Sequence, residues 1–596
     1  MWRVLKNDAS GRLVLIRYGK SMHAGPKPRE SRLARHLLAV KPIGYRGAAA
    51  LRLARCLPVL FLAFTASLVP ARADQPNQEN AIPSFAELQD AGALIGEIRV
   101  FVDDIFDLND PKEDNALFRL ANKLHIRTRP GVIRRMVLFK SGEPVSVRLI
   151  EETERLLRSN RFLYDVSIRP VAYHDGTVDI EVKTRDTWSL YPGVSFKRSG
   201  GENSVSLSLR EENLLGTGTS LSIKNSSDVD RSGTEYQIAQ NHAFGGWTSI
   251  KYSYAILDDG ENQSFNLARP FYALDTRWAA GLSLLKDNRI ESVYNAGEIS
   301  TQYRHRRESA ETYGGWSEGL IDGWTRRYSV GLTYQDDTYE IEPDLVPPPE
   351  LPSDQKLVAP FIRYEVIEDN YLMLKNRDQI ERPEYFAMGF QSTVQLGRSL
   401  TALGSSREVW LYSGSVSDGF ELRSNQTLLM SGSLSGQYGN GMGEHNLFSG
   451  SMRYYAPHSK RALFYVGASG DFVKNPDVSD LLTLGGDNGL RGYPLRYQSG
   501  DRRALLTLEE RIYTDWYPFR LFRVGGAVFF DVGRAWGGEN QNTANPGWLS
   551  DVGFGLRILS ARSAFGNVWH ADVAFPLNPD SNIESVQFLF TGKYSY

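Results

Sequence analysis

The chain has 596 residues and is nearly neutral, with 68 basic and 70 acidic side chains. Its length exceeds that of one ordinary soluble domain, so we expect two or more units of unequal size. Beyond about residue 70 the sequence has no apolar run of about 18 residues or more, which excludes a helical membrane protein but not a β-barrel, whose strands average out to polar.

Residues 1–73 are rich in Lys and Arg and end in an apolar core, Leu57–Phe64, followed by Ala71-Arg72-Ala73. This order predicts a secretory signal peptide cleaved before Asp74, with an Arg-rich mitochondrial presequence as the alternative. Without the leader the chain is acidic, so we expect no nucleic-acid partner. The only cysteine, Cys56, lies in the leader, so we expect a mature chain with no disulfide and no thiolate metal site. We also expect a function that uses no bound cofactor.

Residues 74–95 begin with a polar, proline-containing stretch and are predicted to form a flexible linker. Residues 96–187 have the pattern of a small α/β domain in the order strand, helix, helix, strand, strand. The predicted strands are Glu97–Val102, Phe162–Ala172 and Thr177–Thr184, and the predicted helices are Val132–Phe139 and Ser146–Asn160. Such a domain offers a strand edge to which an extended peptide could add.

From Trp188 to Tyr596 the chain reads as one strand after another. Val205, Leu207 and Leu209, for example, alternate with polar residues, so each strand has one apolar and one polar face. A soluble sandwich would pack the apolar faces inside, but the aromatic content of these faces and the leader favour lipid outside and water within. At roughly 25 residues per strand and its connection, residues 188–596 predict a transmembrane antiparallel barrel of about 16 strands.

Three local patterns indicate a more specific kind of barrel. The first is a glycine-bearing turn, Glu212–Gly218, that contains Asn213, Gly216 and Gly218. The second is the loop segment Leu484–Tyr493, which ends in Arg491-Gly492-Tyr493. The third is a pair of strands, one carrying Glu509 and the other Asp531. By the period-two rule each of these carboxylates lies on a defined face of its own strand. If both faces are luminal, Arg491 could reach the two carboxylates together.

These patterns resemble the superfamily of outer-membrane assembly and translocation proteins that includes BamA, TamA and the two-partner-secretion transporters, also described as bacterial surface antigen barrels. The α/β domain is similar to that superfamily's POTRA domain, most clearly over Leu156–Val166. The Arg491 segment resembles the motif at the tip of the sixth external loop. The resemblance implies a structural lock, in which Arg491, Gly492 and Tyr493 enter the lumen and are held by Glu509 and Asp531. The alternative is that Arg491 is a solvated loop residue.

The two ends of the barrel predict a weak closure. Pro192 and Gly193 lie in the first strand, where proline removes a ladder donor and glycine weakens pairing. Gly592 interrupts the last strand, which ends at Tyr596. We expect a lateral seam here, since an unpaired edge can serve as a template for a client strand.

The sequence therefore predicts an outer-membrane barrel that inserts or translocates polypeptides, with its single legible POTRA domain in the periplasm. Its expected partners are outer-membrane lipid, unfolded outer-membrane or secreted polypeptides, and periplasmic accessory proteins. The alternative is a passive pore or surface-antigen barrel without a protein client. We do not expect an enzyme, because the G-x-S-x-G pattern around Ser317 is not followed by the helix that a nucleophile elbow requires.

Overall fold

The structure is a computed structural model that divides into two units, Met1–Gln78 and Glu79–Tyr596. In the first unit it describes two short paired strands, β1 (Lys6–Asn7) and β2 (Leu13–Val14). In the second it describes residues 82–423, 425–477, 480–538, 547–561, 568–581 and 583–593. The apolar core and the cleavage site of the predicted signal peptide lie outside the described residues.

An α/β domain opens the second unit. Its elements are α1 (Phe85–Asp90), β3 (Leu94–Asp103), α2 (Ala116–Leu124), α3 (Pro130–Met136), α4 (Val147–Arg158), β4 (Leu163–His174) and β5 (Thr177–Asp186). The sheet order is β3–β5–β4, with β3 parallel and β4 antiparallel to β5. The fold begins within the range predicted as a linker, because Ser84 caps α1 in a capping box and Leu88 is buried in the core. Helix α2 is an element that the sequence pattern did not predict.

One apolar core holds this domain together. Helices α3 and α4 cover the sheet, and their side chains Ile133 and Leu157 are fully buried against β5 residues such as Ile180. Helix α4 begins where Ser146 accepts a hydrogen bond from the Leu149 amide, and α3 begins at Pro130, whose fixed φ suits a first helical turn. In the described part of the chain, no helix is both long and apolar enough to cross a bilayer.

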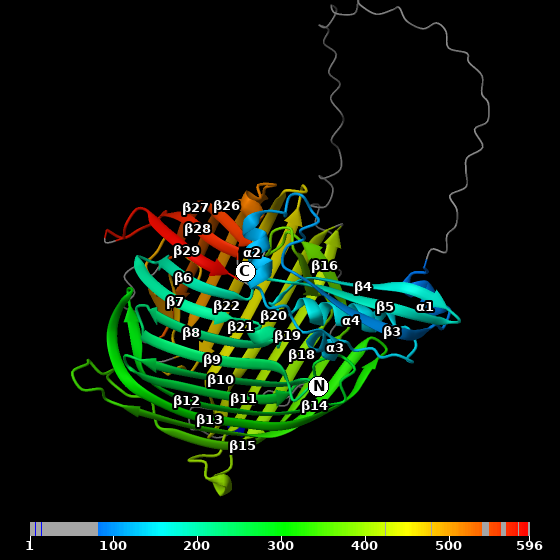
Figure 1. Ribbon diagram of the computed structural model, residues 1–596. Helices are drawn as coiled ribbons and strands as arrows, with labels where there is room; N and C mark the ends of the chain where they lie inside the picture. The colour runs from blue at the N-terminus through cyan, green and yellow to red at the C-terminus, as the bar shows by residue number, and fades with distance from the viewer. Residues whose placement is uncertain are drawn as a thin grey trace, which may run out of the picture. The chain divides into compact units, whose positions relative to one another are not determined.

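Residues 190–593 form a closed antiparallel barrel of 20 described strands, so the prediction of about 16 was wrong. The first ten strands are β6 (Leu190–Ser199), β7 (Glu202–Glu211), β8 (Thr219–Ser227), β9 (Ser232–Ala243), β10 (Thr248–Leu257), β11 (Gly260–Arg269), β12 (Trp278–Asn295), β13 (Glu298–Ile321), β14 (Trp324–Glu340) and β15 (Gln355–Glu368). The other ten are β18 (Gln391–Arg398), β19 (Trp410–Arg423), β20 (Gln426–Gly439), β21 (Met442–Pro457), β22 (Ala462–Lys474), β25 (Arg502–Tyr513), β26 (Phe522–Trp536), β27 (Leu549–Ser560), β28 (Val568–Pro576) and β29 (Gln587–Lys593). Figure 1 shows β6 to β15 curving along one side of the barrel in cyan to green.

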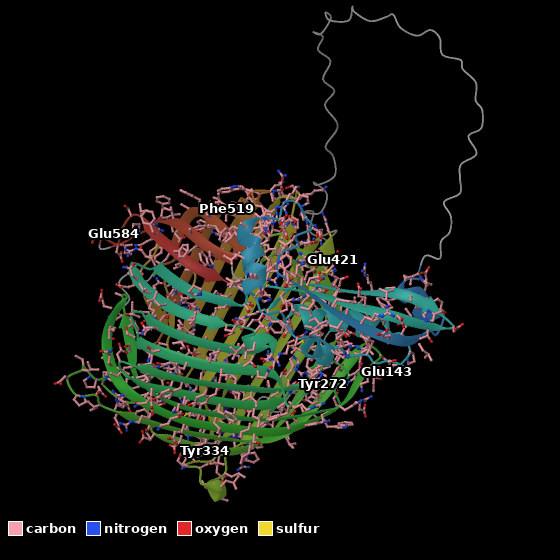
Figure 2. The ribbon with its side chains drawn as sticks, viewed as in Figure 1. Glu143, Tyr272, Tyr334, Glu421, Phe519 and Glu584 are labelled. Atoms are coloured by element: carbon pink, nitrogen blue, oxygen red, sulfur yellow. The ribbon has the colours of Figure 1, made fainter. Side chains whose placement is uncertain are left out.

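The strand count was underestimated because many connections at both ends are short. Residues 322–323 join β13 to β14, and residues 440–441 join β20 to β21. The mean repeat is therefore about 20 residues instead of the roughly 25 expected from alternating short turns and long loops. The alternating pattern itself holds, since Val205, Leu207 and Leu209 of β7 are all exposed on the outer wall. Side chains cover the whole barrel wall in Figure 2.

The barrel has two distinct ends. We call the end that contacts the α/β domain the proximal end and the opposite end the distal end. Two segments other than barrel strands extend from these ends. The luminal hairpin, residues 371–387, contains β16 (Tyr371–Lys375) and β17 (Pro383–Ala387) and belongs to a proximal connection. The inserted loop, residues 475–501, contains β23 (Leu482–Leu484) and β24 (Gln498–Gly500) and belongs to a distal connection.

Candidate functional site

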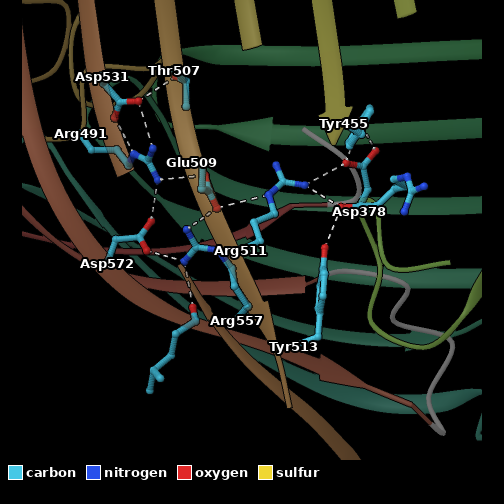
Figure 3. Close-up of polar contacts among 12 residues, drawn as sticks. Asp378, Tyr455, Arg491, Thr507, Glu509, Arg511, Tyr513, Asp531, Arg557 and Asp572 are labelled. Atoms are coloured by element: carbon cyan, nitrogen blue, oxygen red, sulfur yellow. Dashed lines mark hydrogen bonds and ion pairs between the residues drawn. The ribbon is translucent and has the colours of Figure 1, made fainter. Parts of the chain in front are cut away.

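Arg491 of the inserted loop is buried inside the barrel, with 6% of its surface exposed. Its Nε and Nη2 atoms donate hydrogen bonds of 2.7 and 3.0 Å to the two carboxylate oxygens of Asp531. Its Nη1 atom lies 3.7 Å from Oε2 of Glu509, and its guanidinium carbon lies 3.3 Å from the centre of the Phe529 ring. Figure 3 shows the guanidinium between the two carboxylates. The structure thus brings the loop residue Arg491 together with Glu509 and Asp531, the two strand residues that it was predicted to reach if their faces are luminal.

The two residues after Arg491 fit the barrel wall closely. The Gly492 amide donates a 2.9 Å hydrogen bond to Asp551. A Cβ atom at Gly492 would lie 2.7 Å from the Asp551 Cβ, so a larger residue could not approach the wall to this distance. Tyr493 is fully buried, and its hydroxyl donates to the Ser550 carbonyl at 3.1 Å. Both contacts are with strand β27, which the sequence analysis did not assign to the site.

Further charged residues extend the Arg491 cluster along the inner wall. Asp572 of β28 lies 3.4 Å from Arg491 Nη1 and also pairs with Arg557 of β27. Arg557 donates to Glu509 at 3.0 Å, so Glu509 faces the guanidinium groups of both Arg491 and Arg557 as well as that of a third arginine in β25. Both Asp572 and Arg557 are almost fully buried, as a network of mutually compensating charges requires. Neither was predicted, because nothing in the sequence marks which strands become neighbours of β25 and β26.

The luminal hairpin reaches the same network through Arg511 of β25. Arg511 Nη1 lies 3.5 Å from Oδ1 of Asp378, and it donates a 2.6 Å hydrogen bond to the Arg377 carbonyl. The Tyr455 hydroxyl donates to Asp378 at 3.0 Å. On the other side, Arg511 Nε lies 3.4 Å from Glu509. A continuous series of charges therefore joins the proximal hairpin to the distal loop, as Figure 3 shows.

The hairpin tip is itself well ordered by local contacts. The Glu384 carboxylate accepts hydrogen bonds from three successive backbone amides, those of residues 377, 378 and 379, at 3.0 to 3.1 Å. Ile380 is 2% exposed and packs in an apolar cluster with Tyr455, Tyr465 and Tyr513 of the inner wall. The tip is therefore held inside the bore by both apolar and ionic contacts.

The junction of the first and last strands is weakly paired. Strands β6 and β7 pair at ten positions and β28 and β29 at seven, whereas the described part of β29, which ends at Lys593, shares one residue pair with β6, Phe590 with Arg198. A cavity of about 1200 Å³ extends across the bore from this junction to β21 and β22, and Pro192, Gly193 and Gly592 are among the residues that line it. Three of the four predicted seam residues thus lie at the weak junction, and the fourth, Tyr596, lies outside the described residues.

The inserted loop contacts both sides of this junction at the distal end. On the β6 side, the Ser199 hydroxyl donates to the Gly486 carbonyl at 2.5 Å, and the Leu495 amide donates to the Gly200 carbonyl at 3.3 Å. On the β29 side, the loop is held through Gly492 and Tyr493, as described above. Fifteen described barrel strands precede the loop and five follow it, so it is the eighth distal connection and not the sixth that the resemblance implies.

The glycine-bearing turn forms the contact between the barrel and the α/β domain. Asn213 is buried, and its side chain accepts from the Gly218 amide and donates to Thr128 Oγ1, both at 2.7 Å. Gly216 has φ +70°, and a Cβ atom there would lie 2.3 Å from the Arg127 carbonyl oxygen. A Cβ at Gly218 would make ordinary contact with Phe162. All three predicted residues therefore face the α/β domain.

A second contact joins helix α4 to the barrel. Glu152 of α4 is buried, accepts a 2.8 Å hydrogen bond from the Leu274 amide of the β11–β12 connection, and pairs with Arg148 at 3.0 Å. Arg148 also pairs with Asp275 of the same connection. Burial raises the pKa of the Glu152 carboxyl above its usual range. Arg155 of α4 stacks over the Tyr371 ring of the luminal hairpin at 4.0 Å.

A closed antiparallel barrel with an apolar outer wall and a charged, occupied bore defines an integral β-barrel protein of the outer membrane. Residues 213–592 match the Omp85 superfamily domain, and the chain belongs to the Omp85 superfamily. This superfamily comprises outer-membrane proteins of polypeptide insertion and translocation.

Several solved structures are similar to this chain at low sequence identity. The structure of BamA from Haemophilus ducreyi lacking POTRA domains 1-3 is 15% identical, with 83% of this chain and 84% of that chain covered and a TM-score of 0.35. CdiB from Acinetobacter baumannii is 13% identical, with 83% and 73% covered and a TM-score of 0.41. CdiB from Escherichia coli is 13% identical, with 83% and 75% covered and a TM-score of 0.43. A search of curated proteins finds no match.

Proposed function

We propose that this protein inserts or translocates polypeptides at the outer membrane by opening the junction of β6 and β29 as a lateral seam. The observation that carries the proposal is that one residue pair, Phe590 with Arg198, joins the residues of these two strands that the structure describes. Few hydrogen bonds between those residues must break to separate them, and the freed strand edges can each pair with a client strand. The cavity at the junction gives a client hairpin space in which to begin pairing.

The Arg491 cluster acts as the structural lock of this seam. The inserted loop binds Gly200 on the β6 side and Asp531, Asp551 and Asp572 on the β29 side, so it bridges the seam at the distal end. Charge-assisted hydrogen bonds of this kind are worth about 1.5–3 kcal/mol each when they are shielded from water. The loop thus limits how far the distal ends of the two strands separate while a client passes.

The α/β domain is the client-docking POTRA domain in this proposal, and it lies in the periplasm. Strands β3 and β4 are the two edges of its sheet, and an extended client segment can add to such an edge through backbone hydrogen bonds. The domain is attached to the barrel through Asn213 and Gly216, so a docked client is held close to the proximal end of the seam. Periplasmic accessory proteins bind the same domain.

The contents of the bore argue against the alternative of a passive pore. Both the luminal hairpin and the inserted loop place buried side chains, Ile380 and Arg491, inside the barrel. A pore for free diffusion would need these segments to leave. A seam that releases clients into lipid does not, because the client passes through the wall.

A disulfide across the seam tests the proposal directly. In a Cys56→Ser background, cysteines replacing Arg198 and Phe590 face each other in the only described seam pair. The matched control joins Ser431 and Ser451, whose hydroxyls lie 2.7 Å apart between two ordinary neighbouring strands. Client insertion into vesicles should fall at least tenfold when the seam disulfide is oxidised, recover with reductant, and be unchanged by the control disulfide. Equal insertion by oxidised and reduced seam variants would refute the proposal.

A further inference from the structure

Helix α2 carries an apolar stripe that no part of the described structure covers. Leu117, Leu120 and Leu124 are 64%, 51% and 63% exposed. At about 100° per residue these three positions fall within an arc of about 60° on the helix. Ile126, just beyond the helix, is a further 55% exposed. Four large apolar side chains on one short segment form a surface that must meet something other than water.

The opposite side of α2 fixes the helix to the barrel. Phe118 is buried and stacks on Phe106 with ring centres 3.8 Å apart. The two rings and Ile105 form a cluster with Trp188, next to the start of β6, and Leu521, next to the start of β26. Arg520 adds an ion pair with Asp110 at 3.2 Å. In the barrel order β26–β27–β28–β29–β6, these two attachment points lie on either side of the seam.

Exposed apolar side chains of the barrel lie in the same connection that anchors α2. The connection that holds Arg520 also carries Trp516 and Phe519, which are 64% and 80% exposed. Phe519 stands at the barrel rim close to the end of the β26 ribbon in Figure 2. Beyond them, Ile512 of β25 and Val528 of β26 are exposed on the outer wall. Aromatic side chains at the ends of membrane strands mark the level of the lipid headgroups.

The charges around the stripe fit a lipid surface. Lys123 is exposed at the flank of α2, and Arg127 and Arg129 follow the helix, both exposed, with Arg127 3.4 Å from Asp104. Arg119 is 56% exposed beside Asp114. An apolar face with Lys and Arg at its flanks is the composition of a helix that lies in the membrane interface, where the cations meet phosphate groups. A protein partner recognised by burial of the same leucines would not require this basic border.

We propose that α2 is an interfacial helix that inserts Leu117, Leu120 and Leu124 into the lipid leaflet at the proximal end of the seam. The ligand is the phospholipid bilayer itself, contacted beside the strands that open in the proposed function. The inference rests on the proximal end lying at the membrane surface, but it does not require that clients pass through the seam. Its role is to hold the proximal end of β6 against the bilayer.

Site-specific fluorescence tests this contact without a client. In a Cys56→Ser background, single cysteines replace Leu120 or, as the control at the exposed β4–β5 turn of the same domain, His174. Each carries an environment-sensitive nitrobenzoxadiazole probe, and the intact protein is reconstituted in phosphatidylethanolamine and phosphatidylglycerol vesicles. Heat-modifiable mobility verifies that both labelled proteins are folded.

The probe at position 120 should be quenched about threefold or more by lipids with brominated acyl chains and be protected from aqueous iodide, whereas the probe at 174 should show the reverse. Iodide quenching of the 120 probe equal to that of the 174 probe would overturn the inference. Protection of the 120 probe from both quenchers would also overturn it, because a protein surface would then cover the stripe. Failure of the seam disulfide experiment together with quenching by brominated lipid would leave the lipid contact standing and reject only the client pathway.

Discussion

Arg511 lies 3.5 Å from Asp378 and 3.4 Å from Glu509, and it thereby joins two segments that enter the bore from opposite ends. Asp378 belongs to the luminal hairpin, while Glu509 contacts Arg491 of the inserted loop. If either segment moves out of its position in the bore, Arg511 is left with fewer compensating charges. The two segments are therefore coupled electrostatically, and a substitution in one should change how firmly the other is held in the bore.

Arg491→Ala should destabilise the barrel strongly. It leaves Asp531, Glu509 and Asp572 close together without their shared cation, and breaking a buried ion pair costs about 3–5 kcal/mol. The temperature at which the folded band disappears in heat-modifiability gels should fall clearly. Arg502→Ala is the control, because that side chain is 52% exposed and its pair with Asp501 is long. Similar effects of the two substitutions would show that Arg491 has no special role.

Asp378→Asn should loosen the luminal hairpin. The amide keeps the size of the carboxylate but weakens the contact with Arg511 and the hydrogen bond from Tyr455. We expect the ion conductance of the reconstituted barrel to rise severalfold, because the hairpin then leaves its seat more often. Glu381→Gln, the same change at an exposed position of the same hairpin, should leave the conductance near its starting value. A rise in both variants would mean that the Asp378 contact does not hold the hairpin.

The contact of α4 with the barrel should weaken as pH rises. Burial raises the pKa of the Glu152 carboxyl in the folded protein above its unfolded value of about 4.3. Its contribution to stability is therefore fully present below about pH 4.3 and is lost as pH rises through the raised pKa. In thermal unfolding from pH 4 to pH 8, the stability of the Glu152→Gln variant relative to that of the native protein should increase as pH rises. Glu151→Gln, which is exposed in the same helix, should follow the native protein throughout.

Gly216→Ala should disturb the joint between the barrel and the α/β domain. The substitution meets two obstacles, a φ of +70° and a Cβ position 2.3 Å from the Arg127 carbonyl oxygen. Gly92→Ala is the control that has the positive φ without the close contact, because Gly92 has φ +66° with open space around its Cβ position. We expect this substitution to cost only about 1 kcal/mol of backbone strain. Limited proteolysis between the domain and the barrel should accelerate much more for Gly216→Ala. Equal cleavage rates for the two variants would contradict the close approach at Gly216.

The sequence predicted the local parts of the site and missed those that depend on long-range pairing. Arg491, Glu509 and Asp531 could be connected because a period of two fixes which side chains share a face, and a glycine-rich loop carries the cation. Asp572 and Arg557 could not, because their position beside Glu509 follows from the register of β25 to β28. The strand count failed for a related reason, since short turns at both ends of the barrel reduce the repeat.

The luminal hairpin and helix α2 were missed for a different reason. Tyr371–Lys375 begins with four successive apolar residues that resemble part of a strand, and only the fold shows that the segment pairs with β17 inside a proximal connection. Helix α2 is nine residues long, too short to give a sustained apolar period in a sequence pattern. Its attachment through Phe118 depends on Trp188 and Leu521, which lie far from it along the chain.

Three carboxylates that pair with Arg491 in the described structure follow it in the chain: Glu509, Asp531 and Asp572. If the barrel closed before β28 was in place, the arginine in the bore would lack one of its carboxylate partners. The cluster therefore penalises premature or truncated closure, and full neutralisation becomes available only once the C-terminal strands have been added. The same residues that hold the loop in the mature protein thus act as a check on the completeness of the wall during biogenesis.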